Sequence, residues 1–133
     1  MHKTNQELVD IINLHTDNSL GYDAHCIPLY KHGELVTITA VEPLNATTCS
    51  IHMWTRDVRR NWLTRAFIRD MYDYVFEHYT TAVARIDKNN APAIRAAINT
   101  GYTLCYSTEQ QVCYTFTREQ YIKRFSSLLE TPT

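Results

Sequence analysis

One amphipathic segment between two strand-like segments constrains the fold of this chain most strongly. Between about residues 62 and 79, large side chains recur at steps of three and four residues, which is typical of a helix with one buried face. The segments 47–55 and 81–86 on either side have the character of strands. A strand–helix–strand unit predicts a parallel pair of strands with a right-handed crossover, set within an otherwise antiparallel sheet. The recurring positions are Leu63, Phe67, Met71, Tyr74, Val75 and His78.

The N-terminal part predicts a helix followed by a β-hairpin. Thr4 and Glu7 have the spacing of a capping box, so we expect a helix to begin there and to continue to about residue 15. Two β-favouring segments, 26–30 and 35–41, flank a glycine-bearing turn and predict a hairpin. Pro28 cannot donate to a strand ladder, so the first strand is expected at an edge of the sheet or interrupted there.

The C-terminal part predicts a capped helix, a pair of strands and a last helix. Asn90 is a favourable N-cap, and Gly101 is a favourable C-terminal stop for the helix between them. Strands are expected at 102–106 and 111–116, and a helix at 118–129. The whole order predicts one α/β (α+β) domain over residues 1–133, with a mixed, mostly antiparallel twisted sheet, a central parallel pair and flanking helices.

Composition excludes several classes of function. The chain has 133 residues, which fits one domain, and a formal net charge of −1, which indicates no nucleic-acid-binding surface. No apolar segment approaches membrane-spanning length, and the polar N-terminus does not resemble a signal peptide. The four cysteines lack CxxC spacing and the six histidines lack ligand spacing. We therefore expect a cytoplasmic protein with reduced, buried thiols, no metal and no membrane.

A motif in the second half of the chain carries a family resemblance. The segment Asn90-Ala91-Pro92-Ala93-Ile94-Arg95 is followed by Gly101-Tyr102, eleven and twelve positions after the asparagine. Taken alone this describes any capped helix, but with the strand order on both sides it resembles the GNAT acyltransferase superfamily. The resemblance covers about residues 35–116. It is closest in character to the short, divergent members encoded by tailed bacteriophages, which would place the protein in the host cytoplasm or the virion.

The resemblance implies acetyl-CoA as co-substrate. In the family, a loop Arg-x-x-Gly-x-Gly opens the long helix and holds the pyrophosphate, because free N–H groups and the helix dipole attract an anion there. The arginine is present here, but Trp62 and Thr64 fill both glycine positions. A basic, solvated helix start is the alternative interpretation. The matching residues are Arg59, Arg60, Asn61, Trp62, Leu63, Thr64 and Arg65, with Asn90 at the second helix.

The catalytic positions depart from the family pattern as well. Ala97 stands where many members have a tyrosine that protonates the leaving thiolate. Tyr102 or Tyr106 could reach the same space, and Tyr102 is the candidate acid. His52 is the first candidate for the general base and Glu42 the second, although an ordinary strand histidine is the plainer interpretation of His52. The family also implies that the backbone of Met53, Trp54 and Thr55 pairs with the pantetheine arm of the co-substrate.

Three functions are compatible with these residues. The leading one is transfer of an acetyl group from acetyl-CoA to an amine, by direct attack in a ternary complex. The acceptor would be an amine-bearing small molecule or a protein. The alternatives are a catalytically inactive GNAT-fold module with a binding or structural role, and a small regulatory domain that binds CoA. The sequence leaves a monomer and an oligomer equally open.

Overall fold

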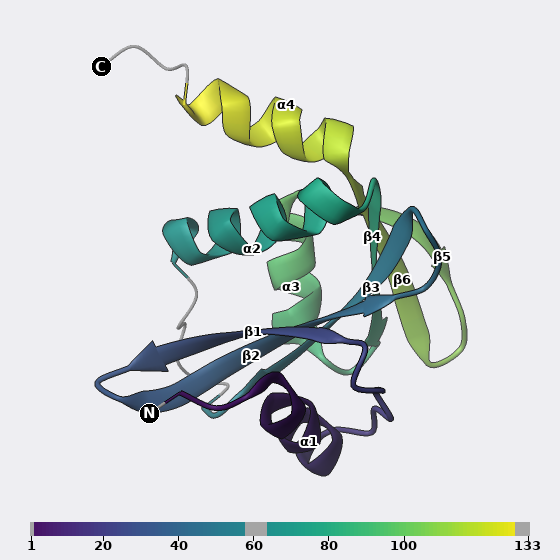
Figure 1. Ribbon diagram of the computed structural model, residues 1–133. Coiled ribbons are helices and arrows are strands. Elements are labelled where there is room, and N and C mark those ends of the chain that lie inside the picture. Colours follow the sequence, from purple (N-terminus) through teal and green to yellow (C-terminus); the bar gives the residue numbers. More distant parts are fainter. Residues whose placement is uncertain (1, 58–63, 130–133) are drawn as a thin grey trace.

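The protein is a four-helix, six-strand domain in a computed structural model that describes residues 2–57 and 64–129 (Figure 1). The sheet order is β1-β2-β3-β4-β6-β5, and every neighbouring pair is antiparallel except β3 and β4, which are parallel. This confirms the predicted fold class. The elements are α1 (Asn5–His15), β1 (His25–Lys31), β2 (Glu34–Pro43), β3 (Thr48–Thr55), α2 (Arg65–His78), β4 (Thr81–Asp87), α3 (Ala91–Thr100), β5 (Thr103–Ser107), β6 (Gln111–Thr117) and α4 (Arg118–Leu129).

Side chains at the helix ends explain where the helices start and stop. The Thr4 hydroxyl accepts from the Glu7 backbone N–H at 3.2 Å, and the Glu7 carboxylate accepts from the Thr4 N–H at 3.0 Å. Asn90 caps α3 by accepting from the Ala93 N–H at 3.3 Å. Gly101 ends α3 with a φ of +117°, a backbone conformation that side chains disfavour. All three caps were predicted from the sequence and are confirmed.

The hairpin of β1 and β2 lies at one edge of the sheet. Strand β1 has β2 as its neighbour and begins the strand order, which confirms the edge position expected from Pro28. The connecting turn has positive φ values at His32 (53°) and Gly33 (80°), which match the right-handed twist of the flanking strands. A bulge lies between Leu29 and Tyr30.

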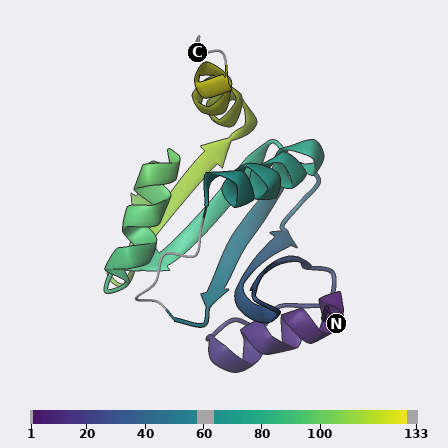
Figure 2. The same ribbon diagram turned by 90° about the vertical axis from the view of Figure 1, so that its left-hand side faces the viewer.

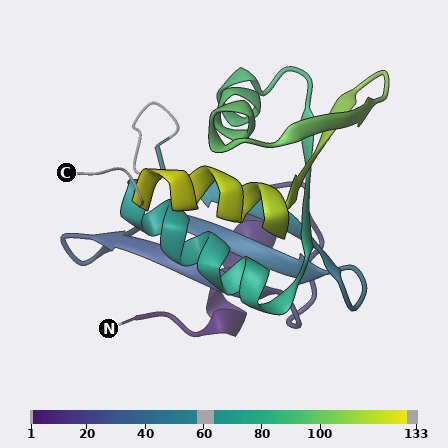
Figure 3. The same cartoon turned by 90° about the horizontal axis from the view of Figure 1, so that it is seen from above.

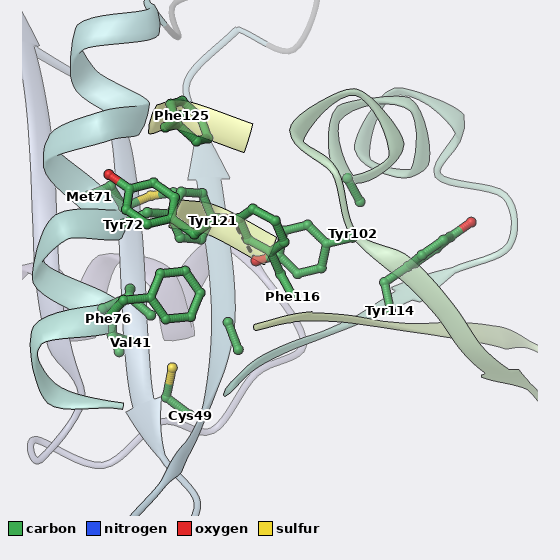
Figure 4. Packing of buried hydrophobic residues seen from close by; sticks show 13 residues of the cluster. Val41, Cys49, Met71, Tyr72, Phe76, Tyr102, Tyr114, Phe116, Tyr121 and Phe125 are labelled. Carbon is green, nitrogen blue, oxygen red and sulfur yellow. Dashed lines mark hydrogen bonds between the residues drawn. The ribbon is translucent and has the colours of Figure 1, made fainter. Parts of the chain in front are cut away.

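Two apolar clusters lie on opposite faces of the sheet. Helix α1 covers one face over β1, β2 and β3, where Leu8, Val9 and Ile12 are buried. Helices α2, α3 and α4 cover the other face, with α4 beside α2 when seen from above (Figure 3). The core on that face is rich in aromatic rings (Figure 4). Its buried residues are Val41, Cys49, Met71, Tyr72, Val75, Phe76, Ala82, Ala97, Tyr102, Tyr114, Phe116, Tyr121 and Phe125.

The four cysteines differ in exposure. All are free thiols, and Cys26, Cys49 and Cys113 are buried, but Cys105 on β5 is exposed. The expectation that all four are buried is therefore wrong for Cys105, because β5 is the last strand of the sheet and all five of its residues are exposed. Burial raises the pKa of Cys26 to about 11 and that of Cys49 to about 12.

These differences predict the reactivity of the thiols. In native protein at neutral pH, a thiol reagent should modify Cys105 first, because the thiolate is the reactive form and burial disfavours it at Cys26 and Cys49. In denatured protein that has not been treated with a reductant, all four thiols should react with the reagent. Counting modified cysteines by mass spectrometry before and after denaturation tests this. A denatured count of two or zero would contradict the free-thiol assignment.

Candidate functional site

Strands β3 and β4 separate at their carboxyl ends. The parallel pairing joins Thr48 to Thr81, Cys49 to Ala82 and Ser50 to Val83, and then stops. Strand β3 nevertheless continues to Thr55 and β4 to Asp87, and Figure 2 shows the two strands diverging. We call the region beyond Ser50 and Val83 the splay. The predicted divergence of the parallel strands is confirmed.

Two helices begin at the same end of the sheet as the splay. Only two residues separate the end of α2 at His78 from the start of β4 at Thr81, so α2 has its N-terminus toward the carboxyl ends of the strands. Its 14 residues span about 21 Å, similar to the length of a seven-residue strand. Helix α3 begins shortly after β4 ends. Because helix N-termini carry free N–H groups and positive partial charge, this end of the sheet favours anions.

The end of β3 has one free backbone edge. Met53, Trp54 and Thr55 pair on one side with β2, opposite Thr39, Ile38 and Thr37 respectively. On the other side the pairing with β4 has already ended at Ser50, so no strand in the described part of the chain covers that edge. The Trp54 ring packs beside α1 and stacks on His15, with ring centroids 5.6 Å apart. The backbone, rather than the Trp54 side chain, is thus available to a ligand in the splay.

The two candidate bases lie in contact. His52 Nε2 is 3.0 Å from Glu42 Oε1, and both side chains are partly buried, with exposed fractions of 20% and 31%. The contact arises from the register, since Ala40 pairs with His52 and Glu42 pairs with Ser50. A two-residue step keeps both side chains on the same face of the sheet. Sequence reasoning named each residue separately but did not predict that they meet.

Thr64 acts as the N-cap of α2. Its hydroxyl accepts from the Phe67 backbone N–H at 3.1 Å, so one of the free N–H groups of this helix already has a partner. Helix α2 begins at Arg65, which is exposed, rather than at about residue 62 as expected from the sequence. The other residues proposed for the pyrophosphate loop, Arg59, Arg60, Asn61, Trp62 and Leu63, lie outside the described residues. The signal for the cap was present, because threonine is a preferred N-cap residue.

Tyr102, the candidate acid, lies in the aromatic core. Its hydroxyl is 2.5 Å from that of Tyr72, and its ring stacks on Phe116 (Figure 4). Burial raises the pKa of Tyr102 well above its usual value, and the neighbouring Tyr72 raises it further. Ala97 belongs to the same core. These contacts give Tyr102 a clear packing role, and a role in proton transfer stays a prediction.

The described residues, 2–57 and 64–129, offer neither a metal-binding cluster nor a membrane-spanning helix. These residues contain no group of three or more His, Cys, Asp or Glu side chains placed to hold a metal ion. Within the same ranges, no helix combines the length and the apolar character needed to cross a membrane.

Solved structures similar to this one are N-acetyltransferases. No protein-family model and no curated protein matches the sequence. The chain is similar to spermidine/spermine N-acetyltransferase SpeG from Vibrio cholerae, with a TM-score of 0.70 at 12% identity over 92% of this chain and 95% of that one. It is similar to ribosomal-protein-alanine N-acetyltransferase from Brucella melitensis, with a TM-score of 0.64 at 11% identity over 88% and 98%.

A third similar structure holds the co-substrate. N-acetyltransferase PseH from Campylobacter jejuni, in complex with acetyl coenzyme A, has a TM-score of 0.62 at 12% identity over 85% of this chain and 78% of that one. With the parallel pair at the centre of a mostly antiparallel sheet, these likenesses define the class of fold. The chain has the GNAT fold of the N-acetyltransferases.

Proposed function

We propose that the protein is an acyl-CoA-dependent N-acyltransferase that moves an acetyl group from acetyl-CoA to an amine. One observation carries the proposal: the sheet of this GNAT fold opens at the splay, and the His52–Glu42 pair stands on β3 and β2 beside the opening. The pair offers a base for the amine next to a free backbone edge for the co-substrate. The acceptor would be an amine-bearing small molecule or a protein.

The residues around the splay fit an acyl-CoA. The free edge of β3 at Met53, Trp54 and Thr55 would pair with the amide groups of the pantetheine arm, since such pairing depends on backbone groups. The N-terminus of α2, with the cation of Arg65, would attract the pyrophosphate. When bound, the thioester supplies an activated carbonyl carbon to the amine.

The His52–Glu42 contact determines which imidazole nitrogen can accept a proton. An ionised carboxylate only accepts hydrogen bonds, so Nε2 carries the hydrogen that is donated to Glu42. The free nitrogen is then Nδ1, which would take a proton from the incoming ammonium. Glu42 would hold the ring in this tautomer and stabilise the imidazolium that forms. The neutral amine then attacks the thioester directly, and positioning of the two substrates supplies much of the rate.

An inactive GNAT-fold module is the second candidate, and two residues favour it. The Thr64 hydroxyl occupies the Phe67 N–H, which would otherwise be free for a phosphate oxygen. Ala97 provides no acid for the leaving thiolate. An origin in a tailed bacteriophage, with a place in the host cytoplasm or virion, stays a prediction from the sequence resemblance alone.

Removing the Thr64 cap should strengthen acetyl-CoA binding. Thr64→Gly releases the Phe67 N–H for phosphate, which should lower the Kd for acetyl-CoA by about 5-fold, equivalent to one modest hydrogen bond. Combined with Trp62→Gly, the effect should increase. Thr4→Gly is the matched control, because Thr4 caps α1 with the same contact away from the splay. Isothermal titration calorimetry at several salt concentrations measures both, and binding should weaken as salt rises.

The acetyl-CoA binding measurement distinguishes the acyltransferase from the inactive GNAT-fold module. If wild-type protein and both glycine variants bind no acetyl-CoA at millimolar ligand, the acyltransferase proposal fails and the module remains. Equal strengthening by Thr4→Gly would show that the change is unrelated to the α2 N-terminus.

A further inference from the structure

A pocket of about 230 Å³ lies beyond the splay, between β4 and the hairpin of β5 and β6. Neither His52, Glu42 nor any of the residues proposed to bind acetyl-CoA lines this pocket. Figure 1 shows the three strands side by side at this end of the sheet. The lining residues are Arg85, Tyr106, Thr108, Gln111, Val112 and Cys113.

Side-chain alternation places the key residues of this pocket on the α1 side of the sheet. Ala82, Ala84 and Ile86 of β4 pack into the aromatic core beneath α2 and α3, so Arg85 points to the opposite face. Cys113, which pairs with Arg85 in the β4–β6 register, shares that face. Helix α1 contacts β1, β2 and β3 on this side and leaves β4, β6 and β5 largely uncovered.

The same alternation brings Arg85 into line with His52. Ser50 and Val83 are the last paired residues of β3 and β4, and His52 and Arg85 each lie two residues further on. A two-residue step keeps a side chain on its face of the sheet, so His52 and Arg85 stand at one level on the two sides of the splay. Paired strands are about 4.8 Å apart, and no β3–β4 pair follows Ser50 and Val83, so the backbones of His52 and Arg85 lie at least that far apart.

The two sides of the splay carry opposite charge. On the β4 side, Arg85 has no carboxylate within ion-pair distance among the described residues. Asp87, the nearest acid along the strand, instead accepts from Gln111 Nε2 at 3.1 Å. Tyr106 lines the same pocket as Arg85 and raises the pKa of its guanidinium, and an arginine is charged at neutral pH in any case. On the β3 side, the Glu42 carboxylate beside His52 suits an ammonium group.

We propose that the acceptor is an amine that also carries a carboxylate, such as an amino acid, with its amine at His52–Glu42 and its carboxylate at Arg85. This assignment rests on the proposed acetyl transfer. The ammonium loses a proton to His52, and its nitrogen forms a bond to the acetyl carbonyl carbon. The carbon–sulfur bond then breaks and the CoA thiolate leaves with the electron pair, while the cationic nitrogen releases its second proton, which the thiolate takes up. The carboxylate takes no part in bond changes and fixes the position of the amine.

Matched pairs of acceptors test the carboxylate site. Phenylalanine and phenethylamine, lysine and cadaverine, and 4-aminobutyrate and propylamine differ by the carboxylate, and product formation with acetyl-CoA is followed by mass spectrometry. Wild-type protein should favour the carboxylate-bearing member of at least one pair by about 10-fold in kcat/KM, the size expected for one charged hydrogen bond. Arg85→Gln should remove that preference without slowing the decarboxylated amine. Arg85→Lys should remove part of it.

A control variant and a binding measurement keep the two proposals separable. Lys123→Gln on α4 makes the same change in charge and should leave the preference intact. Binding of the amino acids alone is measured by NMR titration of wild-type protein and Arg85→Gln. Arg85-dependent binding in protein that binds no acetyl-CoA supports the carboxylate site while the acyltransferase proposal fails. Acetylation of both members of every pair at equal rates, or a preference unchanged in Arg85→Gln, overturns the carboxylate site and leaves the transferase standing.

Discussion

Replacing His52 with alanine is expected to lower kcat about 100-fold, the usual contribution of a positioned general base. The alanine removes the Nδ1 acceptor but leaves the free edge of β3 and the helix N-termini, so the Kd for acetyl-CoA should change little. Glu42→Gln should lower kcat by about 10-fold, because the amide cannot stabilise an imidazolium by charge. Acetylated product is measured by mass spectrometry, since the free thiols of the protein would disturb a colorimetric assay for released CoA.

A matched histidine control separates catalysis from folding. His32→Asn alters the β1–β2 turn, where asparagine tolerates the positive φ of 53°, and should leave kcat unchanged. If His52→Ala and His32→Asn have equal activity while both variants remain folded, His52 is not the base. A loss of acetyl-CoA binding in His52→Ala would instead indicate a role in holding the co-substrate.

Gly101→Val is expected to destabilise the fold by about 3 kcal/mol. Residue 101 has a φ of +117°, and an added Cβ would lie 3.1 Å from Arg124 Cδ and 3.3 Å from Phe116 Cε1. Phe116 is completely buried and cannot move aside, so backbone strain and overpacking act together. The melting temperature should fall by about 12 °C for a domain of this size.

Gly101→Asn provides the comparison, because asparagine tolerates positive φ better than valine. Its loss should be about 1 kcal/mol, so the two variants should separate clearly in thermal or urea unfolding. Equal destabilisation by both would mean that contact with Phe116 dominates over backbone conformation. No loss with valine would show that the end of α3 differs from the conformation described.

Local chemistry made much of the fold predictable. Thr4, Asn90 and Gly101 act through residues within a turn of themselves, so their roles were evident without tertiary information. The helix between two strands required a crossover, and the parallel pair followed from it. The start of α2 was predicted a few residues too early. The spacing of apolar residues shows which face of a helix is buried, but it does not fix the residue at which the helix begins.

The site was less predictable because it depends on long-range register. His52 and Glu42 meet only because β2 and β3 pair with one particular offset, and a shift of one residue would put them on opposite faces. Tyr102 lies against Tyr72, thirty residues earlier, through the packing of α2 on the sheet. Arg85 lies across the splay from His52 because each is two residues beyond the last β3–β4 pair. No local sequence pattern marks where that pairing ends.

The short β3–β4 ladder also has a consequence for how the chain reaches its native state. Strands β1, β2 and β3 follow one another along the chain and pair as neighbours, and β5 pairs with the next strand, β6. The three β3–β4 pairs, by contrast, join residues 33 positions apart and require closure of the loop that contains α2. Contacts of such sequence separation form slowly compared with hairpins. The β4–β6 pairs are similarly distant, at 24 to 36 positions. We therefore expect both ladders of β4 to form after the β1–β2, β2–β3 and β5–β6 hairpins, so that the splay, which begins where the β3–β4 ladder ends, is assembled late.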